Sequence, residues 1–84
     1  MQKKSYEEIW NNCLTIISDN VSVQNFKTWF KPIKAVALNE KILTIQVPSQ
    51  FFYEWLEKNY ITLIKKTLKR ELGKDAKLEY NILL

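Results

Sequence analysis

The sequence predicts an α+β domain with the element order α-α-β-β-α-β, in which a three-stranded sheet packs against three helices. Pro32 and Pro48 bracket a segment with β-type alternation of apolar residues, and proline interrupts regular structure at its own position. On both sides of this segment, as far as Leu72, apolar residues recur with helical spacing. A serine precedes each helical segment, as is typical of N-caps. These serines are Ser5, Ser22 and Ser49.

We expect the first helix to run from Tyr6 to about Asp19. The serine before it forms a capping box with Glu8. The apolar residues of this helix cover an arc of about 160° at about 100° per residue, whereas one face of a small domain usually needs nearer to 100°. One edge of the helix should therefore stay exposed, with Trp10 and Leu14 lying on one side of the arc.

A second, shorter helix is expected from Val23 to Phe30. The segment Ile33–Leu38 is β-prone, and Ile42–Val47 alternates apolar with polar residues, which is typical of a strand with one buried face. Between the two strands, Asn39-Glu40-Lys41 predicts a hairpin turn, with the asparagine able to adopt a positive φ.

The third helix should run from Gln50 to about Leu72, with Gly73 following at the position where a positive φ is favourable. Its apolar stripe rotates along the helix, so we expect a bend near Asn59. Lys77–Leu84 alternates and is expected to form the last strand. Five aromatic residues are predicted to lie in the core: Phe26, Trp29, Phe30, Phe52 and Trp55.

Composition argues against an enzyme. The chain has no histidine, a single glycine and a single cysteine among 84 residues, so the commonest general base, a glycine-rich phosphate loop and a Cys/His zinc site are all missing. We therefore predict no catalytic residue, no metal and no cofactor. Cys13, a lone thiol in an amphipathic helix, favours packing over nucleophilic chemistry. The net charge of +4 permits weak contact with nucleic acid or acidic proteins.

The sequence favours a cytoplasmic location. One cysteine cannot form an internal disulfide, which suits a reducing compartment. Met1–Lys4 is polar and leads into an amphipathic stretch, unlike a signal peptide. No apolar run approaches the roughly 20 residues of a membrane span, so no membrane contact is expected. The length fits one domain over 1–84, which we interpret as a module cut from a longer protein.

Several segments together resemble the N-terminal domain (domain I) of the bacterial chromosomal replication initiator DnaA, over nearly the whole chain. The segments are Ile9-Trp10-Asn11-Asn12-Cys13-Leu14, Phe26-Lys27-Thr28-Trp29-Phe30-Lys31-Pro32, Leu43-Thr44-Ile45-Gln46-Val47-Pro48-Ser49-Gln50-Phe51, Trp55-Leu56 and Tyr60. The resemblance implies a K-homology-like fold and a protein–protein interaction domain. ATP binding is then expected only in a later domain that this chain lacks.

The resemblance also implies partners and contact residues. The expected partners are a second copy in weak self-association, the replicative helicase and regulators of initiation. Ile9, Trp10 and Cys13 match the self-association positions of the family. Phe51 matches a helicase- and regulator-contact aromatic. The same surface is bordered by Asn25, Thr28, Trp29, Ser49 and Gln50. Some family members have an acidic residue where this chain has the neutral Asn25.

Three features have two interpretations each. Trp10 is either core or interface, and Phe51 either packs locally over Trp55 or contacts a partner. Four basic residues of the third helix form either a solvated face near the helix C-terminus or a nucleic-acid patch: Lys65, Lys66, Lys69 and Arg70. K-homology domains clamp single strands with a GXXG loop, which this chain lacks. The alternative function, a small single-stranded nucleic-acid-binding module, therefore implies at most weak, salt-sensitive binding.

Overall fold

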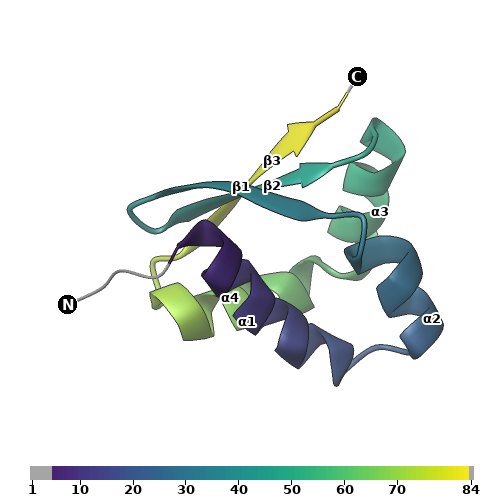
Figure 1. The fold of residues 1–84 in the computed structure, drawn as a ribbon, viewed down its shortest axis with the longest axis horizontal. Coiled ribbons are helices and arrows are strands. Elements are labelled where there is room, and N and C mark those ends of the chain that lie inside the picture. Colours follow the sequence, from purple (N-terminus) through teal and green to yellow (C-terminus); the bar gives the residue numbers. More distant parts are fainter. Residues whose placement is uncertain (1–4, 84) are drawn as a thin grey trace.

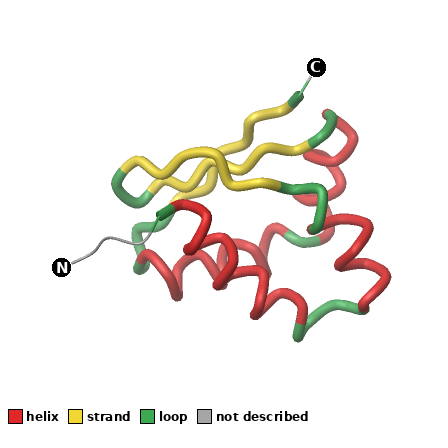
Figure 2. Tube along the Cα trace, in the orientation of Figure 1, coloured by secondary structure: helices red, strands yellow, loops and turns green. Residues whose placement is uncertain are grey.

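A three-stranded sheet forms one layer of the domain, and helices cover one of its faces (Figure 1). The computed structural model describes residues 5–83. Met1–Lys4, on which the signal-peptide prediction rests, and Leu84, the last residue of the predicted final strand, lie outside the described residues. Figure 2 shows the strands above and the helices mostly below them. The predicted α+β class is confirmed.

The sheet is mixed, with β2 (Ile42–Val47) in its centre. Strand β1 (Lys34–Asn39) pairs with β2 in antiparallel fashion, and a bulge between Ala35 and Ala37 interrupts the register. Strand β3 (Lys77–Ile82) pairs with β2 in parallel. The alternation predicted for β2 is confirmed, because its three inward-facing side chains are fully buried: Leu43, Ile45 and Val47.

The hairpin turn differs from the prediction at one residue. The positive φ of 57° belongs to Glu40, whereas Asn39 is the last residue of β1. Asn39 pairs with Ile42 in the antiparallel ladder and must therefore be extended. The reversal of the chain consequently falls on the residue after it.

Helix α1 (Tyr6–Ser18) lies beside α4 (Ile61–Leu72) beneath the sheet (Figure 1). Its predicted cap is confirmed, since Ser5 Oγ accepts the backbone N–H of Glu8 at 3.1 Å. The helix also packs against β1, so two neighbouring elements cover its apolar arc.

The second helical segment begins as α2 (Val23–Asn25) and continues as the π-helix η1 (Phe26–Phe30). The cap at Ser22 is confirmed by a 3.1 Å bond from the Asn25 N–H. In the wider π turn, the Lys31 N–H donates to the Phe26 carbonyl at 3.1 Å. Such turns are rare and frequently occur at functional sites.

The predicted long helix consists of α3 (Gln50–Asn59) and α4, separated at Tyr60. Tyr60 has φ −128° and ψ 0°, outside the helical range. The expected bend near Asn59 is thus a break one residue later. Gly73 ends α4 with φ 98°, as its position predicts.

Candidate functional site

Four aromatic side chains from η1 and α3 form one cluster at the surface, which we call the aromatic surface: Trp29, Phe51, Phe52 and Trp55. Trp29 is its centre. The Trp29 ring stacks on Trp55 with a centroid distance of 4.8 Å and an angle of 13°. Its centroid lies 5.0 Å from that of Phe52 and 5.9 Å from that of Phe51. The cluster therefore joins two helical segments through ring contacts.

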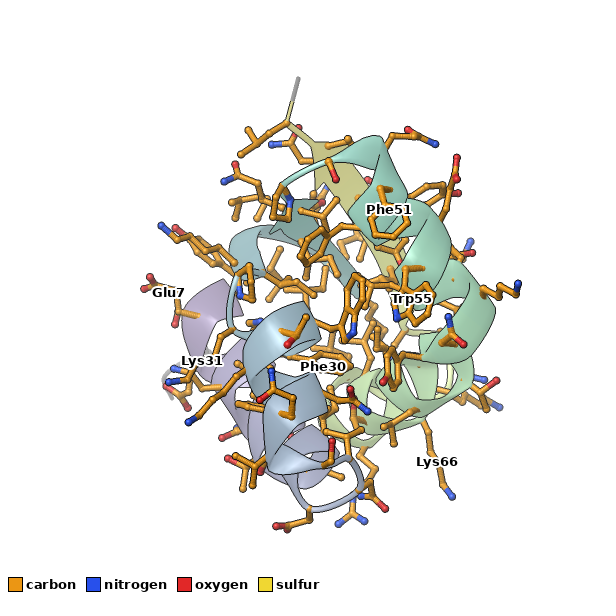
Figure 3. The ribbon with its side chains drawn as sticks, turned by 90° about the vertical axis from the view of Figure 1, so that its right-hand side faces the viewer. Glu7, Phe30, Lys31, Phe51, Trp55 and Lys66 are labelled. Atoms are coloured by element: carbon orange, nitrogen blue, oxygen red, sulfur yellow. The ribbon has the colours of Figure 1, made fainter. Side chains whose placement is uncertain are left out.

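The position of Phe51 follows from the start of α3. Ser49 Oγ accepts the Phe52 N–H at 3.3 Å and fixes the first turn. Phe51 and Trp55 are four residues apart and share one side of the helix, as Figure 3 shows. The Phe51 side chain is 60% exposed. Phe51 thus contacts Trp55 and is also exposed to a partner, so both of its interpretations fit this position.

Trp55 corrects the predicted core. Its side chain is 36% exposed, whereas we expected a core position. The reason is geometric, because Trp55 lies one turn after Phe51 and stacks on Trp29 rather than entering the space beneath the sheet. Phe30 is fully buried, as predicted, while Phe26, Trp29 and Phe52 are half-buried against the core.

The other residues expected at this surface are polar and uncharged. Gln50 is exposed, and its Nε2 donates to Glu54 Oε2 at 3.2 Å. Thr28 is exposed beside Trp29 in η1 and accepts a bond from Gln24 Nε2 at 3.1 Å. Asn25 is exposed four residues before Trp29. The structure therefore brings Trp29, Ser49, Gln50 and Phe51 together around the start of α3.

The three residues matched to self-association lie in the interior. Ile9 is 2% exposed, Trp10 3% and Cys13 0%. The prediction that Trp10 adds surplus apolar surface is wrong, because β1 and α4 both pack on α1 and cover an arc wider than one face. Self-association through these residues stays a prediction.

The Trp10 side chain lines a hollow of about 500 Å³ between α1 and β1. The hollow is bordered by Glu7 from the helix and by Lys31 and Lys34 from the start of the strand region. Within residues 5–83, the Trp10 Nε1–H is buried without a hydrogen-bond partner. The indole thus contributes apolar area to the core at the cost of an unsatisfied donor.

Burial makes the Cys13 side chain a poor nucleophile. It raises the pKa of the Cys13 thiol, an effect that the Thr67 hydroxyl opposes and Glu71 reinforces. Burial also raises the pKa of the Tyr80 phenol, together with the nearby Glu57 carboxylate, which accepts its proton at 2.9 Å. The packing interpretation of Cys13 therefore agrees with its environment.

These two raised pKa values predict alkaline destabilisation. Because the folded state holds both protons more tightly than the unfolded state, both groups favour folding at neutral pH. This contribution falls as the pH rises above about 8.5, where an unfolded thiol ionises. We expect the urea midpoint to decrease between about pH 8.5 and 10.5. The double variant Cys13→Ala/Tyr80→Phe should show a smaller decrease than the wild type. An equal decrease in the two proteins would contradict the assignment to these residues.

The basic residues predicted on the third helix are exposed on α4, but they do not all line the same hollow. Lys65 and Lys69 line a hollow of about 650 Å³ between α4 and the start of β3. Lys66 joins them around an adjoining hollow of about 330 Å³, and Arg70 borders neither. Two lysines that we did not predict at this site line the larger hollow from the loop and from β3: Lys74 and Lys77. The sequence did contain a signal for them, because lysines continue to occur after Gly73, at positions 74 and 77.

Two kinds of site receive no support in the described part of the chain. Within residues 5–83, no three His, Cys, Asp or Glu side chains come together in a way that could hold a metal ion. No helix among these residues has both the length and the apolar character that crossing a membrane requires.

Comparison with known proteins gives a consistent result. The family model of the DnaA N-terminal domain matches residues 7–70. A chromosomal replication initiator protein DnaA from Flavobacterium psychrophilum is 57% identical over 94% of the chain, and one from Bacteroides fragilis is 48% identical over the whole chain. The relative from Thermodesulfovibrio yellowstonii is 32% identical over 89% of the chain. The chain spans only 16%, 18% and 17% of the length of these three relatives, respectively.

Proposed function

Because the chain belongs to the DnaA N-terminal domain family, we propose that it is a non-catalytic protein-interaction domain of a chromosomal replication initiator. It recruits the replicative helicase and regulators of initiation through the aromatic surface, and it self-associates weakly. The proposal assigns it no cofactor and a cytoplasmic location. The observation that carries it is the 60% exposed ring of Phe51, positioned against Trp29 and Trp55.

The aromatic surface has the composition of an interface centre. Aromatic residues dominate binding energy at interfaces, since they bury a large area for a small loss of conformational freedom. The Phe51 ring rests on Trp29, which is itself held by Phe52 and Trp55. The cluster is therefore ordered before a partner arrives, which reduces the entropy lost on binding.

The neutral residues beside the cluster indicate the kind of contact. Gln50, Thr28 and Asn25 provide hydrogen-bonding groups but no formal charge. Such an arrangement matches an apolar interface centre surrounded by a polar rim. With Asn25 neutral, we expect the salt concentration to have little influence on binding at this surface.

Weak self-association fits the same function through local concentration. When many initiators line up on an origin, each contact forms within one assembly, and the effective concentration replaces intrinsic affinity. Helicase bound at the aromatic surface would then be delivered to the opened DNA.

The decisive test is Phe51→Ala in a pulldown with the helicase of the same organism. We expect binding to fall by about tenfold or more, because truncating an aromatic hot spot at the centre of an interface costs about 2 kcal/mol or more. Tyr6→Ala is the matched control, since Tyr6 is a 37% exposed aromatic on α1, outside the aromatic surface. Circular dichroism should show both variants folded. Equal binding by wild type and folded Phe51→Ala would refute the role of Phe51.

A further inference from the structure

The free edge of β3 has unpaired backbone groups. Within residues 5–83, β3 pairs with β2 alone and ends the sheet. The Lys77 N–H donates to the Lys41 carbonyl at 2.9 Å, and the Leu83 N–H donates to the Val47 carbonyl at 3.0 Å. Odd-numbered residues of β3 thus bond to β2. Because alternate residues of a strand direct their backbone groups to opposite edges, those of Leu78 and Tyr80 point to the open edge, where another strand can pair.

Lysines surround the beginning of this edge. The larger hollow between α4 and β3 is lined by seven residues, of which four are lysines and only Asp75 is acidic: Lys65, Lys69, Lys74, Asp75, Ala76, Lys77 and Leu78. Lys41 adds a further ammonium group, with its Nζ 3.5 Å from the position that a Cβ on Gly73 would occupy. The four lysines that line the hollow carry more charge than Asp75 can neutralise. Their charges are therefore available to a ligand.

The middle of β3 has a different charge. Tyr80 donates to Glu57 on α3 at 2.9 Å, and the Tyr53 ring packs edge-on against the Tyr80 ring at 4.7 Å. Glu57 is exposed and places a negative charge there. A ligand along this edge would meet positive charge near Lys77 and negative charge near Tyr80, so its acidic residues should gather at the Lys77 end.

Three kinds of occupant can be compared. A second copy joined in antiparallel fashion through β3 would place the two lysine groups at opposite ends of the pair, so neither group would neutralise the charge of the other. Single-stranded nucleic acid is normally held by aromatic side chains that stack on its bases, and no aromatic residue lines the hollow. An acidic peptide in extended conformation satisfies both features, because its carboxylates pair with ammonium groups and its backbone pairs with the edge.

We propose that the free edge of β3 binds an acidic, extended segment of a partner protein as a fourth strand. Carboxylates on the helix-facing side of this segment pair with Lys65 and Lys69, and those on the outer side lie near Lys77. This site shares no residue with the aromatic surface, and Figure 3 shows Lys66, which borders the adjoining hollow, low in the view and Phe51 high in it. The domain can therefore hold two partners, or two parts of one partner, at once.

Fluorescence anisotropy of the full chain with a labelled peptide of alternating glutamate and valine tests the charge contacts. We expect saturable binding at low salt that weakens steeply as salt is added. The double variant Lys65→Glu/Lys69→Glu should bind on the order of tenfold more weakly, since it replaces two attractions by repulsions. The control Lys27→Glu/Lys31→Glu changes the net charge equally on exposed positions outside the hollow and should bind nearly as wild type. Absence of peptide binding, or equal loss in both double variants, would overturn the proposal.

A second pair of ligands tests strand addition and the type of ligand. Two further peptides, methylated on the backbone nitrogens of either the odd or the even residues, keep the charge, and each lacks the hydrogen-bond donors of one edge. At least one of them should lose binding if the peptide joins the sheet, and undiminished binding by both would contradict the fourth strand. Labelled oligothymidylate should bind more weakly than the peptide at equal ionic strength. Tighter binding of oligothymidylate, abolished by Lys65→Glu/Lys69→Glu, would assign the site to nucleic acid instead.

Discussion

Trp10→Ala is expected to lower the free energy of unfolding by about 3–5 kcal/mol, as truncation of a buried tryptophan does. Trp10 is 3% exposed and lines the space between α1 and β1. Small domains are stable by only about 5–15 kcal/mol. The variant should therefore show a much lower urea midpoint and could unfold near physiological temperature.

Trp10→Phe provides the comparison that separates ring volume from the indole N–H. It retains an aromatic ring and removes the buried Nε1 donor that lacks a partner within the described residues. Its cost should be clearly smaller than that of the alanine variant. A loss below about 1 kcal/mol for Trp10→Ala, typical of exposed sites, would contradict the buried position.

The two Trp10 variants also differ in their value for measuring self-association. Trp10→Ala would reduce a dimer population simply by unfolding the domain, so a loss in that variant says nothing about an interface. Sedimentation of the folded Trp10→Phe variant is the informative experiment. A reduced dimer population of the folded Trp10→Phe variant relative to the wild type would support a direct role of Trp10 in the contact, and an unchanged population would contradict it.

Phe30→Ala is the second change with a large expected effect, again about 3–5 kcal/mol of unfolding free energy. Phe30 is fully buried at the end of η1. Its ring meets the edge of Tyr60 with a centroid distance of 5.1 Å and lies 6.0 Å from Phe26. The ring thus ties the π-helix to the break between α3 and α4, and aromatic pairs add about 0.5–1.5 kcal/mol beyond their buried area.

Phe26→Ala is the matched control for this prediction. Phe26 is on the same helical segment but only half-buried, so its truncation should cost less. Urea denaturation of both variants gives the comparison. An equal or larger cost for Phe26→Ala would show that Phe30 does not hold the two segments together.

Local patterns in the sequence predicted much of the fold, because their causes are local. Ser5, Ser22 and Ser49 cap helices through bonds to the third residue after each. The period of two in β2 required one buried face, and Gly73 adopts the positive φ that only glycine takes easily. The rotation of the apolar stripe predicted a bend near Asn59, and the structure has a break at Tyr60.

Tertiary contacts explain what the sequence could not predict. The width of an apolar arc does not reveal how many neighbours cover it, so Trp10 was expected at an edge although both β1 and α4 pack on its helix. Trp55 was assigned to the core from its residue type, yet its stacking partner Trp29 lies at the surface. Lys74 and Lys77 join the α4 lysines only because the chain folds back after Gly73.

The central position of β2 also sets the order in which the domain can be completed during synthesis. Its antiparallel neighbour β1 precedes it directly, whereas its parallel neighbour β3 pairs Lys77 with Ile42 across most of the second half of the chain. While a ribosome is still making α4, one flank of β2 has no partner. The nascent chain can therefore close its sheet only after the final strand has left the exit tunnel, which makes this domain dependent on its last residues for protection against aggregation.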